Sequence, residues 1–338
     1  MRCLAPVLFV ITLLCMGQVS YGLIVDQGDL EKESGSSAIL EEMTGFLGSE
    51  LEERPAFPYS LHVGIVGLGS GVYLGDGWVL TSAHVGCHSF TLSDGSSYGV
   101  EENSWTVLES EVGGSSDLAL FKVRVREGSS LSELGEVAVA ESTPDNNSQL
   151  ILAGTGFIQQ RKPATLSSNG EVLAVIGYRT KPTRGVSWGL NRLNQIVDAP
   201  VETGEAYQTR CITTEFNRSK FEAQAAAGDS GGAIFAWSSI RERWELAGCI
   251  IAVTQKGEYV PFGSRTYSAD LAFYQDQMPG AELIEFAGFE CDSDWWVELE
   301  LEDEKPKADT PSKVDRLLGS LSLPAVLISA VVPDIWSN

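Results

Sequence analysis

Short alternating runs of apolar and β-branched residues dominate the middle of the chain. Three of them follow closely on one another, at Tyr59–Val66, Ser70–Leu74 and Trp78–Thr81, and glycine-rich turns such as Gly75–Gly77 separate them. Runs of this length are typical of antiparallel sheets, because side chains alternate along a strand and glycine permits tight turns. The pattern therefore predicts an all-β fold, built as an antiparallel barrel or sandwich.

The first 22 residues follow a different pattern. Arg2 is the one charged residue before Asp26, an apolar run covers Leu4–Met16, and small residues precede Gly22. This predicts a secretory signal peptide that is cleaved after Gly22. An uncleaved membrane anchor is the alternative, but the run is shorter than the roughly 20 residues that a spanning helix needs. Residues 23–54 are acidic and rich in serine and glycine, which indicates an N-terminal or pro-segment.

The last 60 residues carry three patterns in succession. Apolar and acidic residues alternate in Trp295–Glu302, which fits an added edge strand with an acidic outer face. Residues 302–313 are charged and contain two prolines, as linkers do. Residues 317–332 are apolar but interrupted by Gly319 and Pro324. They fit a short docking element, with a membrane anchor or sorting tail as the alternative.

The charge of the chain narrows the classes of partner. Removal of the signal peptide leaves 22 basic and 46 acidic residues, a net charge of −24. Nucleic acid and anionic membrane surfaces repel such a chain, so neither is an expected partner. Four cysteines remain, which allow two disulfides in three connectivities, and Cys249 also fits a buried thiol. They are Cys87, Cys211, Cys249 and Cys291.

A serine between glycines is the strongest chemical signal in the chain. In Gly228–Gly232, Asp229 precedes Ser230 and an apolar run follows. Glycine on both sides permits tight backbone geometry, which can expose a serine nucleophile and turn the amides of Gly228 and Ser230 toward a developing oxyanion. Read alone, the same motif also fits a polar surface turn.

Two further residues stand where a catalytic base and its partner would be needed. His84 follows the apolar run that ends at Thr81, and Asp117 begins the apolar run that ends at Val123. Small residues beside His84 let another strand end come close, and an aspartate before a buried strand meets few competing waters. His62 lies within a strand-like run and His88 lies in a loop, so both fit the role of base less well.

In this order and with these flanking strands, His84, Asp117 and Ser230 resemble the trypsin/chymotrypsin-like serine peptidases, in particular a secreted bacterial member. The resemblance covers roughly residues 58–278. It implies two six-stranded antiparallel β-barrels with a short C-terminal helix, preceded by residues 23–54 and followed by an extension over 279–338. The peptidase domain would span 55–278. Other matching motifs are Gly69–Gly71, Trp78–His84, Ala153–Gly156, Trp244–Ile251 and Tyr267–Tyr274.

The resemblance implies a mechanism as well as a fold. Ser230 would be the nucleophile, His84 the general base and Asp117 the residue that orients and stabilises the imidazole, with the oxyanion hole made by the amides of Gly228 and Ser230. No metal-ligand cluster or phosphate loop stands out, so no cofactor is expected. The chain would be a monomeric, secreted or periplasmic serine endopeptidase that acts on proteins or peptides. A catalytically silent binding protein and an esterase-like hydrolase are the alternatives.

The chain departs from the family in its substrate pocket. The residue that usually sets specificity is Gln224, and the pocket mouth is formed by small residues such as Ala227, which favours a neutral side chain at the cleavage point. Glu222 is close enough to keep basic specificity open. The serine that usually supports the buried aspartate is absent from Cys249–Val253, where Ala252 would contribute to substrate binding.

Activation has three possible routes from the sequence. Asp229 is the residue that would pair with a newly freed N-terminus, because a buried carboxylate needs a partner. Cleavage after Gly45 would free Phe46 and remove a propeptide. Loss of the signal peptide alone would free Leu23 or Ile24. In the third route nothing inserts, and Asp229 is satisfied internally.

Overall fold

The computed structural model describes seven segments of the chain. They are residues 23–25, 57–160, 164–169, 171–204, 207–219, 221–254 and 258–279. The expected signal peptide, most of the segment expected over 23–54, nearly all of the expected C-terminal extension and Cys291 lie outside these residues. The expected all-β class is confirmed, because the regular elements of the described segments are strands and short 3-10 helices.

The second half of the chain closes into a six-stranded antiparallel barrel. Its strands follow one another around the barrel in the order β13-β16-β21-β19-β18-β9. Alternate residues fill the interior, including Leu152, Ile212 and Ile250, which are almost fully buried. The strand bounds are β9 Gln149–Gly154, β13 Ser187–Ile196, β16 Cys211–Glu215, β18 Ala233–Ser238, β19 Arg243–Val253 and β21 Arg265–Asp270.

The first half forms an open sheet instead of the second closed barrel that was expected. Its strands belong to a nine-stranded sheet in the order β14-β15-β8-β4-β3-β2-β5-β6, with β7 paired to β8. β5 and β6 contain two residues each, too few to close the sheet through continuous ladders in the described segments. The bounds are β2 Val63–Val66, β3 Gly69–Gly75, β4 Trp78–Thr81, β5 Phe90–Thr91, β6 Ser97–Tyr98, β7 Thr106–Glu109 and β8 Ser115–Lys122.

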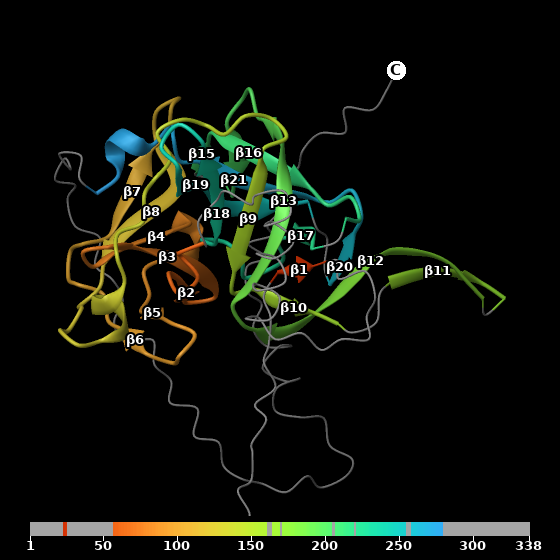
Figure 1. The fold of residues 1–338 in the computed structure, drawn as a ribbon, viewed down its shortest axis with the longest axis horizontal. Helices are drawn as coiled ribbons and strands as arrows, with labels where there is room; N and C mark the ends of the chain where they lie inside the picture. The colour runs from red at the N-terminus through yellow and green to blue at the C-terminus, as the bar shows by residue number, and fades with distance from the viewer. Residues whose placement is uncertain are drawn as a thin grey trace, which may run out of the picture.

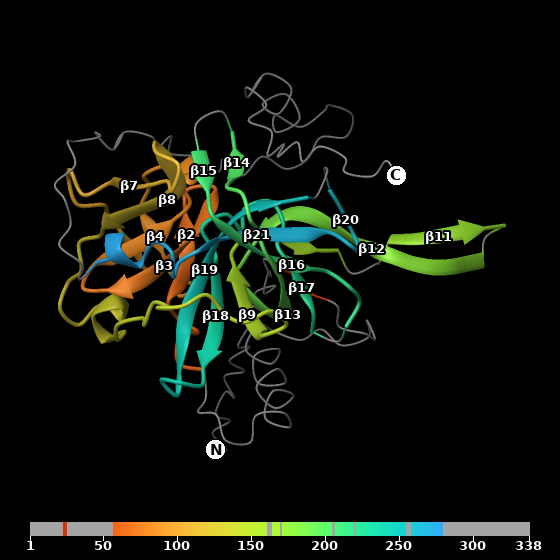
Figure 2. The same ribbon diagram turned by 90° about the horizontal axis from the view of Figure 1, so that it is seen from above.

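Two strands from the second half cross over and join this sheet. β14 (Val201–Thr203) and β15 (Tyr207–Thr209) form a hairpin, and β15 lies parallel to β8 with Tyr207 opposite Ser115. In Figures 1 and 2 this hairpin stands beside β8, at the boundary between the two halves. The start of β8, and therefore Asp117, is covered by a segment from the other half of the chain.

A long hairpin extends away from the body. β11 (Ala164–Ser168) pairs with the first part of β12 (Glu171–Arg184), and both project outward in Figures 1 and 2. The base of β12 pairs with β10 (Phe157–Gln159) and β20 (Tyr259–Pro261). The hairpin is therefore anchored at the end of β12 that lies against the barrel.

The hydrophobic core runs across both halves. One cluster of buried side chains contains Val72 and Leu118 from the sheet together with Ile151 and Phe235 from the barrel. Phe57 lies at the centre of an aromatic group, and its ring centroid is 4.9 Å from that of Phe235. Burial of each such large side chain contributes about 1.5–3 kcal/mol to the free energy of folding. The two halves therefore depend on each other for stability.

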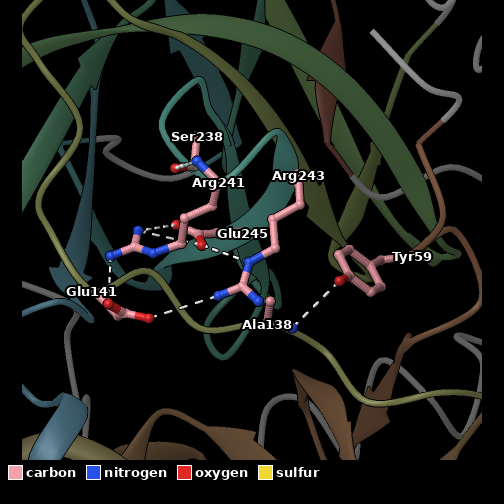
Figure 3. Close-up of polar contacts among 7 residues, drawn as sticks. All are labelled: Tyr59, Ala138, Glu141, Ser238, Arg241, Arg243 and Glu245. Atoms are coloured by element: carbon pink, nitrogen blue, oxygen red, sulfur yellow. Dashed lines mark hydrogen bonds and ion pairs between the residues drawn. The ribbon is translucent and has the colours of Figure 1, made fainter.

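An ion-pair cluster fixes the segment that connects the halves to the β18–β19 hairpin (Figure 3). Glu245 is buried and accepts hydrogen bonds from Arg241 and, at 2.8 Å, from Arg243. Both arginines also face Glu141 of the connecting segment. The backbone of Leu246 continues the attachment with hydrogen bonds to residues 138 and 140.

The short C-terminal helix does not form as expected in the described residues. β21 ends at Asp270, a turn follows, and Gln275–Gln277 makes a single 3-10 turn. Pro279 disfavours helical geometry at Met278, which explains why no α-helix grows from this turn. No helix in the described part of the chain is long and apolar enough to cross a membrane.

Replacement of Glu245 by glutamine is expected to destabilise the fold. The substitution keeps the volume but removes the charge that both arginines face, and it should lower the free energy of unfolding by about 1 kcal/mol, since the arginines are partly hydrated. Urea unfolding measures the change. Glu242→Gln, on the exposed turn of the same hairpin, is the matched control, and equal effects of the two substitutions would contradict this role.

Candidate active site

His84 and Asp117 come together where two neighbouring strands meet. β4 ends at Thr81 and pairs antiparallel with β8, so the 3-10 helix Ala83–Val85 lies beside the start of β8. Asp117 Oδ2 is 2.7 Å from His84 Nδ1, and Oδ1 accepts a hydrogen bond from the His84 amide at 2.9 Å. A carboxylate at Nδ1 favours the tautomer with its proton there, which leaves Nε2 free to accept a proton.

Asp117 is fully buried and is held from the opposite half of the chain. Its amide donates a hydrogen bond to Thr209 Oγ1 at 2.8 Å, and Thr209 is also fully buried. Tyr207 lies on the same strand, and burial together with the charge of Asp117 raises its pKa. Thr209 could not be predicted from the sequence, because nothing along the chain indicates that β15 returns to β8.

Two thiols occupy the core behind this pair. Burial raises the pKa of Cys249 and, to a lesser extent, so does the negative charge of Asp117. The pKa of Cys211 is raised by the same two causes in the same order. Both are buried free cysteines, so the two disulfides that four cysteines allow do not both form, and Cys249 is a buried thiol, as its apolar surroundings in the sequence had suggested. Cys87 and Cys291 remain as the candidate pair.

One carbonyl oxygen joins the turn of His84 to the loop of Ser230. Ile250 O accepts a hydrogen bond from Ser82 Oγ at 2.7 Å and another from the Gly231 amide at 2.7 Å. Ser82 and Gly231 are therefore fixed to the same atom, although they come from opposite halves of the chain. His84 lies two residues after Ser82, and Ser230 lies one residue before Gly231. The shared carbonyl therefore brings His84 and Ser230 into the same small region.

The loop around Ser230 requires glycine and leaves two amides without backbone acceptors among the described residues. Gly231 has a φ of +85°, and a Cβ there would lie 1.9 Å from Ser70 O. Ala227 O accepts from the Phe157 amide, and Asp229 O accepts from the Gly232 amide. In a trans peptide the N–H points opposite to the C=O, so the amides of Gly228 and Ser230 point away from these contacts. Within the described residues, neither amide donates to another backbone group.

Asp229 is a fully buried carboxylate with neutral donors on both oxygens. Oδ1 accepts from the Gly156 amide at 2.7 Å and Oδ2 from the Ala226 amide at 2.8 Å. Burial raises the pKa of Asp229 to about 7, against the opposing effect of these amides and of Arg184. A Cβ at Gly154 would lie 2.2 Å from Oδ1, which explains the glycine there. A further positive charge would favour the ionised form.

The residues of the expected substrate pocket are neutral and closely packed. Gln224 is fully buried in β17 (Ala223–Gln224), and its Nε2 donates to Ala225 O at 3.2 Å. Ala227 is partly exposed, and Ala252 is buried on β19. Glu222 does not turn its Oε2 toward the pocket, because this atom accepts from the amides of residues 217 and 219.

Residues 23–25 pack into the barrel. β1 (Ile24–Val25) pairs antiparallel with β17, and Ile24 lies opposite Gln224. The Leu23 amide donates to Ser187 Oγ, and the Val25 amide donates to Gln159 Oε1 at 3.0 Å. Leu23 is thereby linked to the surroundings of Asp229, because Ser187 pairs with Gly154 and a Cβ on Gly154 would lie 2.2 Å from Asp229 Oδ1. The competing segment that begins at Phe46 lies outside the described residues.

The other histidines occupy structural positions. His62 is buried, its Nε2 lies 3.1 Å from Gly135 O, and burial lowers its pKa. His88 packs against Gly67, where a Cβ would approach its ring to 2.3 Å. Within the described residues, His84 is the histidine that contacts a buried aspartate.

Comparison with known proteins places this geometry in context. The family model described as Trypsin matches residues 47–269. Similar solved structures include an inactive form of Rv3671c from M. tuberculosis H37Rv, at 12% identity over 67% of this chain and 90% of that one, with a TM-score of 0.41. The active form of the Rv3671c protease has 12% identity, covers 67% and 81%, and gives 0.40. The HtrA-type protease AlgW with a decapeptide has 18% identity, covers 62% and 50%, and gives 0.38. None of the curated proteins matches the chain.

Thr209→Val is expected to impair catalysis more than binding. The substitution keeps the shape of the side chain but leaves the buried Asp117 amide without an acceptor, which costs about 1–3 kcal/mol and can displace the carboxylate from His84. We expect kcat for a fluorogenic peptide to fall roughly tenfold or more, with KM nearly unchanged. Thr209→Ser keeps the hydroxyl and should retain most activity. Equal kinetics for the valine and serine variants would contradict this role.

Proposed function

We propose that Ser230, His84 and Asp117 form the catalytic triad of this protein. The chain belongs to the trypsin family and is a serine-type endopeptidase. The observation that carries the proposal is the 2.7 Å contact between His84 Nδ1 and Asp117 Oδ2. It is supported by the Ile250 carbonyl, which binds Ser82 beside His84 and Gly231 beside Ser230. A buried aspartate, an oriented histidine and a glycine-flanked serine are the parts that acyl transfer needs.

In the proposed mechanism Ser230 Oγ attacks the carbonyl carbon of the scissile peptide bond. His84 Nε2 takes the serine proton, and Asp117 stabilises the resulting imidazolium. The amides of Gly228 and Ser230 donate to the oxyanion that develops. His84 then gives the proton to the leaving amine, which leaves an acyl group on Ser230. Water, deprotonated by His84, attacks the carbonyl carbon of this ester. The bond between that carbon and Ser230 Oγ then breaks, His84 returns the proton to Oγ, and the carboxylic acid product leaves.

The proposed substrates are proteins or peptides with a neutral side chain at the cleavage point. Gln224 carries no charge, and the hydrogen bonds of Glu222 to residues 217 and 219 hold its carboxylate in that loop. Small residues such as Ala227 leave the pocket mouth open. Cleavage restricted to sites after lysine or arginine would contradict this preference.

The proposed activation step is release of Leu23 by removal of the signal peptide after Gly22. Support comes from the burial of residues 23–25 and from the hydrogen bond of the Leu23 amide to Ser187 Oγ. An ammonium group at Leu23 would add a positive charge near Asp229, whose burial raises its pKa to about 7. That charge would favour the ionised carboxylate and fix the loop that holds Gly228.

This route also assigns a compartment. Removal of a signal peptide implies a secreted or periplasmic protein, in which a disulfide between Cys87 and Cys291 could form and persist. We expect the protein to act as a monomer. The acidic charge of the chain does not favour nucleic acid as a partner.

Labelling with a fluorophosphonate tests the triad. The purified protein is expected to form a covalent adduct on Ser230, because the probe needs both an activated serine and an oxyanion hole. Ser230→Ala should lose labelling completely, and His84→Ala should slow it at least about a thousandfold. Peptide mapping by mass spectrometry identifies the modified residue.

His88→Ala is the matched control for the histidine, since it lies four residues from His84 in the same region. It should label at close to the rate of the unaltered protein. Labelling on another serine, or full labelling of His84→Ala, would overturn the assignment of the triad.

N-terminal sequencing tests the activation route. The active protein is expected to begin at Leu23. A chain that keeps residues 20–22 before Leu23 should have kcat/KM at least about tenfold lower, because its first ammonium group cannot reach the site near Asp229. An active protein that begins at Phe46 would instead support propeptide removal and contradict this route.

A further inference from the structure

Arg184 lies where the outer hairpin meets the active-site loops. It is the last residue of β12, and its guanidinium reaches the backbone of both halves of the chain. Nη1 donates to Gly67 O at 2.8 Å and Nη2 donates to Gly69 O, both in the first half. Nε donates to Thr155 O at 3.0 Å, and Nη2 also contacts Thr155 Oγ1.

These contacts lead by a short path to the oxyanion loop. The Thr155 amide donates to Ser70 Oγ at 2.9 Å, and Ser70 Oγ donates to Gly228 O at 3.0 Å. The Ser70 amide donates to Ser230 O at 2.6 Å. Ser70 therefore holds both residues whose amides would form the oxyanion hole, and Arg184 holds the two turns on either side of Ser70.

The charge of Arg184 acts in the same place. A Cβ on Gly228 would lie 3.5 Å from Arg184 Nε, so the guanidinium lies directly against this loop. Asp229 is fully buried between Gly228 and Ser230, and the positive charge of Arg184 opposes the effect of burial on that carboxyl. Burial lowers the pKa of Arg184, but a guanidinium titrates so far above neutrality that it stays charged.

We infer that Arg184 is a positioning residue for the oxyanion hole, which fastens the turns of Gly67–Gly69 and Thr155 around Ser70 and so fixes the amides of Gly228 and Ser230. This inference rests on the proposed function, because it needs Ser230 to be the nucleophile. Lysine cannot replace the arginine fully, since the site uses three separate carbonyl oxygens that a planar fork of donors can reach together.

The test compares Arg184→Ala, Arg184→Lys and Arg179→Ala in hydrolysis of a fluorogenic peptide. Arg179 is an exposed residue of the same strand and serves as the matched control. We expect Arg184→Ala to lower kcat about 10- to 100-fold with KM changed by less than about twofold, because the oxyanion hole acts in the transition state. The kcat of Arg184→Lys should lie between those of Arg184→Ala and the unaltered protein. The kcat of Arg179→Ala should equal that of the unaltered protein.

Chemical rescue separates positioning from a general structural role. Millimolar guanidinium ion is expected to restore part of kcat in Arg184→Ala and to leave Arg179→Ala unchanged, while urea unfolding of both variants stays cooperative. If Arg184→Ala does not fold, the intermediate kcat and unchanged KM of Arg184→Lys carry the test. Unchanged kcat in both Arg184 variants, or an effect confined to KM, would overturn the inference.

Fluorophosphonate labelling of the unaltered protein keeps the two hypotheses apart. Absence of labelling on Ser230 would show that the proposed function fails, whatever Arg184 does. If Ser230 is labelled at the same rate in Arg184→Ala as in the unaltered protein, the triad stands and only the positioning role of Arg184 is refuted.

Discussion

The proposed active site depends on contacts between the two halves of the chain, and the Ile250 carbonyl links the segments that carry His84 and Ser230. It accepts hydrogen bonds from Ser82, just before His84, and from Gly231, just after Ser230. Neither half would contain a complete triad, because His84 and Asp117 belong to the open sheet and Ser230 precedes a strand of the barrel. A buried carbonyl has two lone pairs, so one atom can fix both segments at once. The shared hydrophobic core stabilises this contact between the halves, since their separation would expose to water buried side chains from both of them.

Two fully buried carboxylates, Asp117 and Asp229, lie in the two linked segments, and their hydrogen bonds and neighbouring charges differ. Asp117 uses both oxygens on His84, and its amide is held by Thr209. Asp229 has two backbone amides and the nearby charge of Arg184, yet burial still raises its pKa to about 7. A buried carboxylate is costly without a charged partner. A positive charge beside Asp229 would therefore favour its ionised form, and both the freed Leu23 and Arg184 would act there.

The sequence predicted what is local and missed what depends on contacts between distant segments. Alternating apolar runs and glycine turns correctly predicted the strands near His84 and Asp117. The flanking glycines made Ser230 the candidate nucleophile, which stays a prediction. The path of β15 back to β8 has no local signature, so Thr209 was missed. Arg184 ends an ordinary strand, and its importance comes from carbonyl groups more than a hundred residues away. The number of cysteines allowed two disulfides without selecting any pair, and the fold buries Cys211 and Cys249 in the core as free thiols. The terminal helix was expected by resemblance, but up to residue 279, where this part of the described chain ends, only the 3-10 turn Gln275–Gln277 forms before Pro279.

The most direct test of this account is a crystal structure of the protein with a peptide boronate bound. Boron should be bonded to Ser230 Oγ, with one boronate oxygen within hydrogen-bond distance of the amides of Gly228 and Ser230. His84 should remain in contact with Asp117, and the Ile250 carbonyl should still accept from Ser82 and Gly231. A boronate bonded elsewhere, or bonded to Ser230 with both amides turned away, would contradict the claim that contacts between the halves assemble the active site.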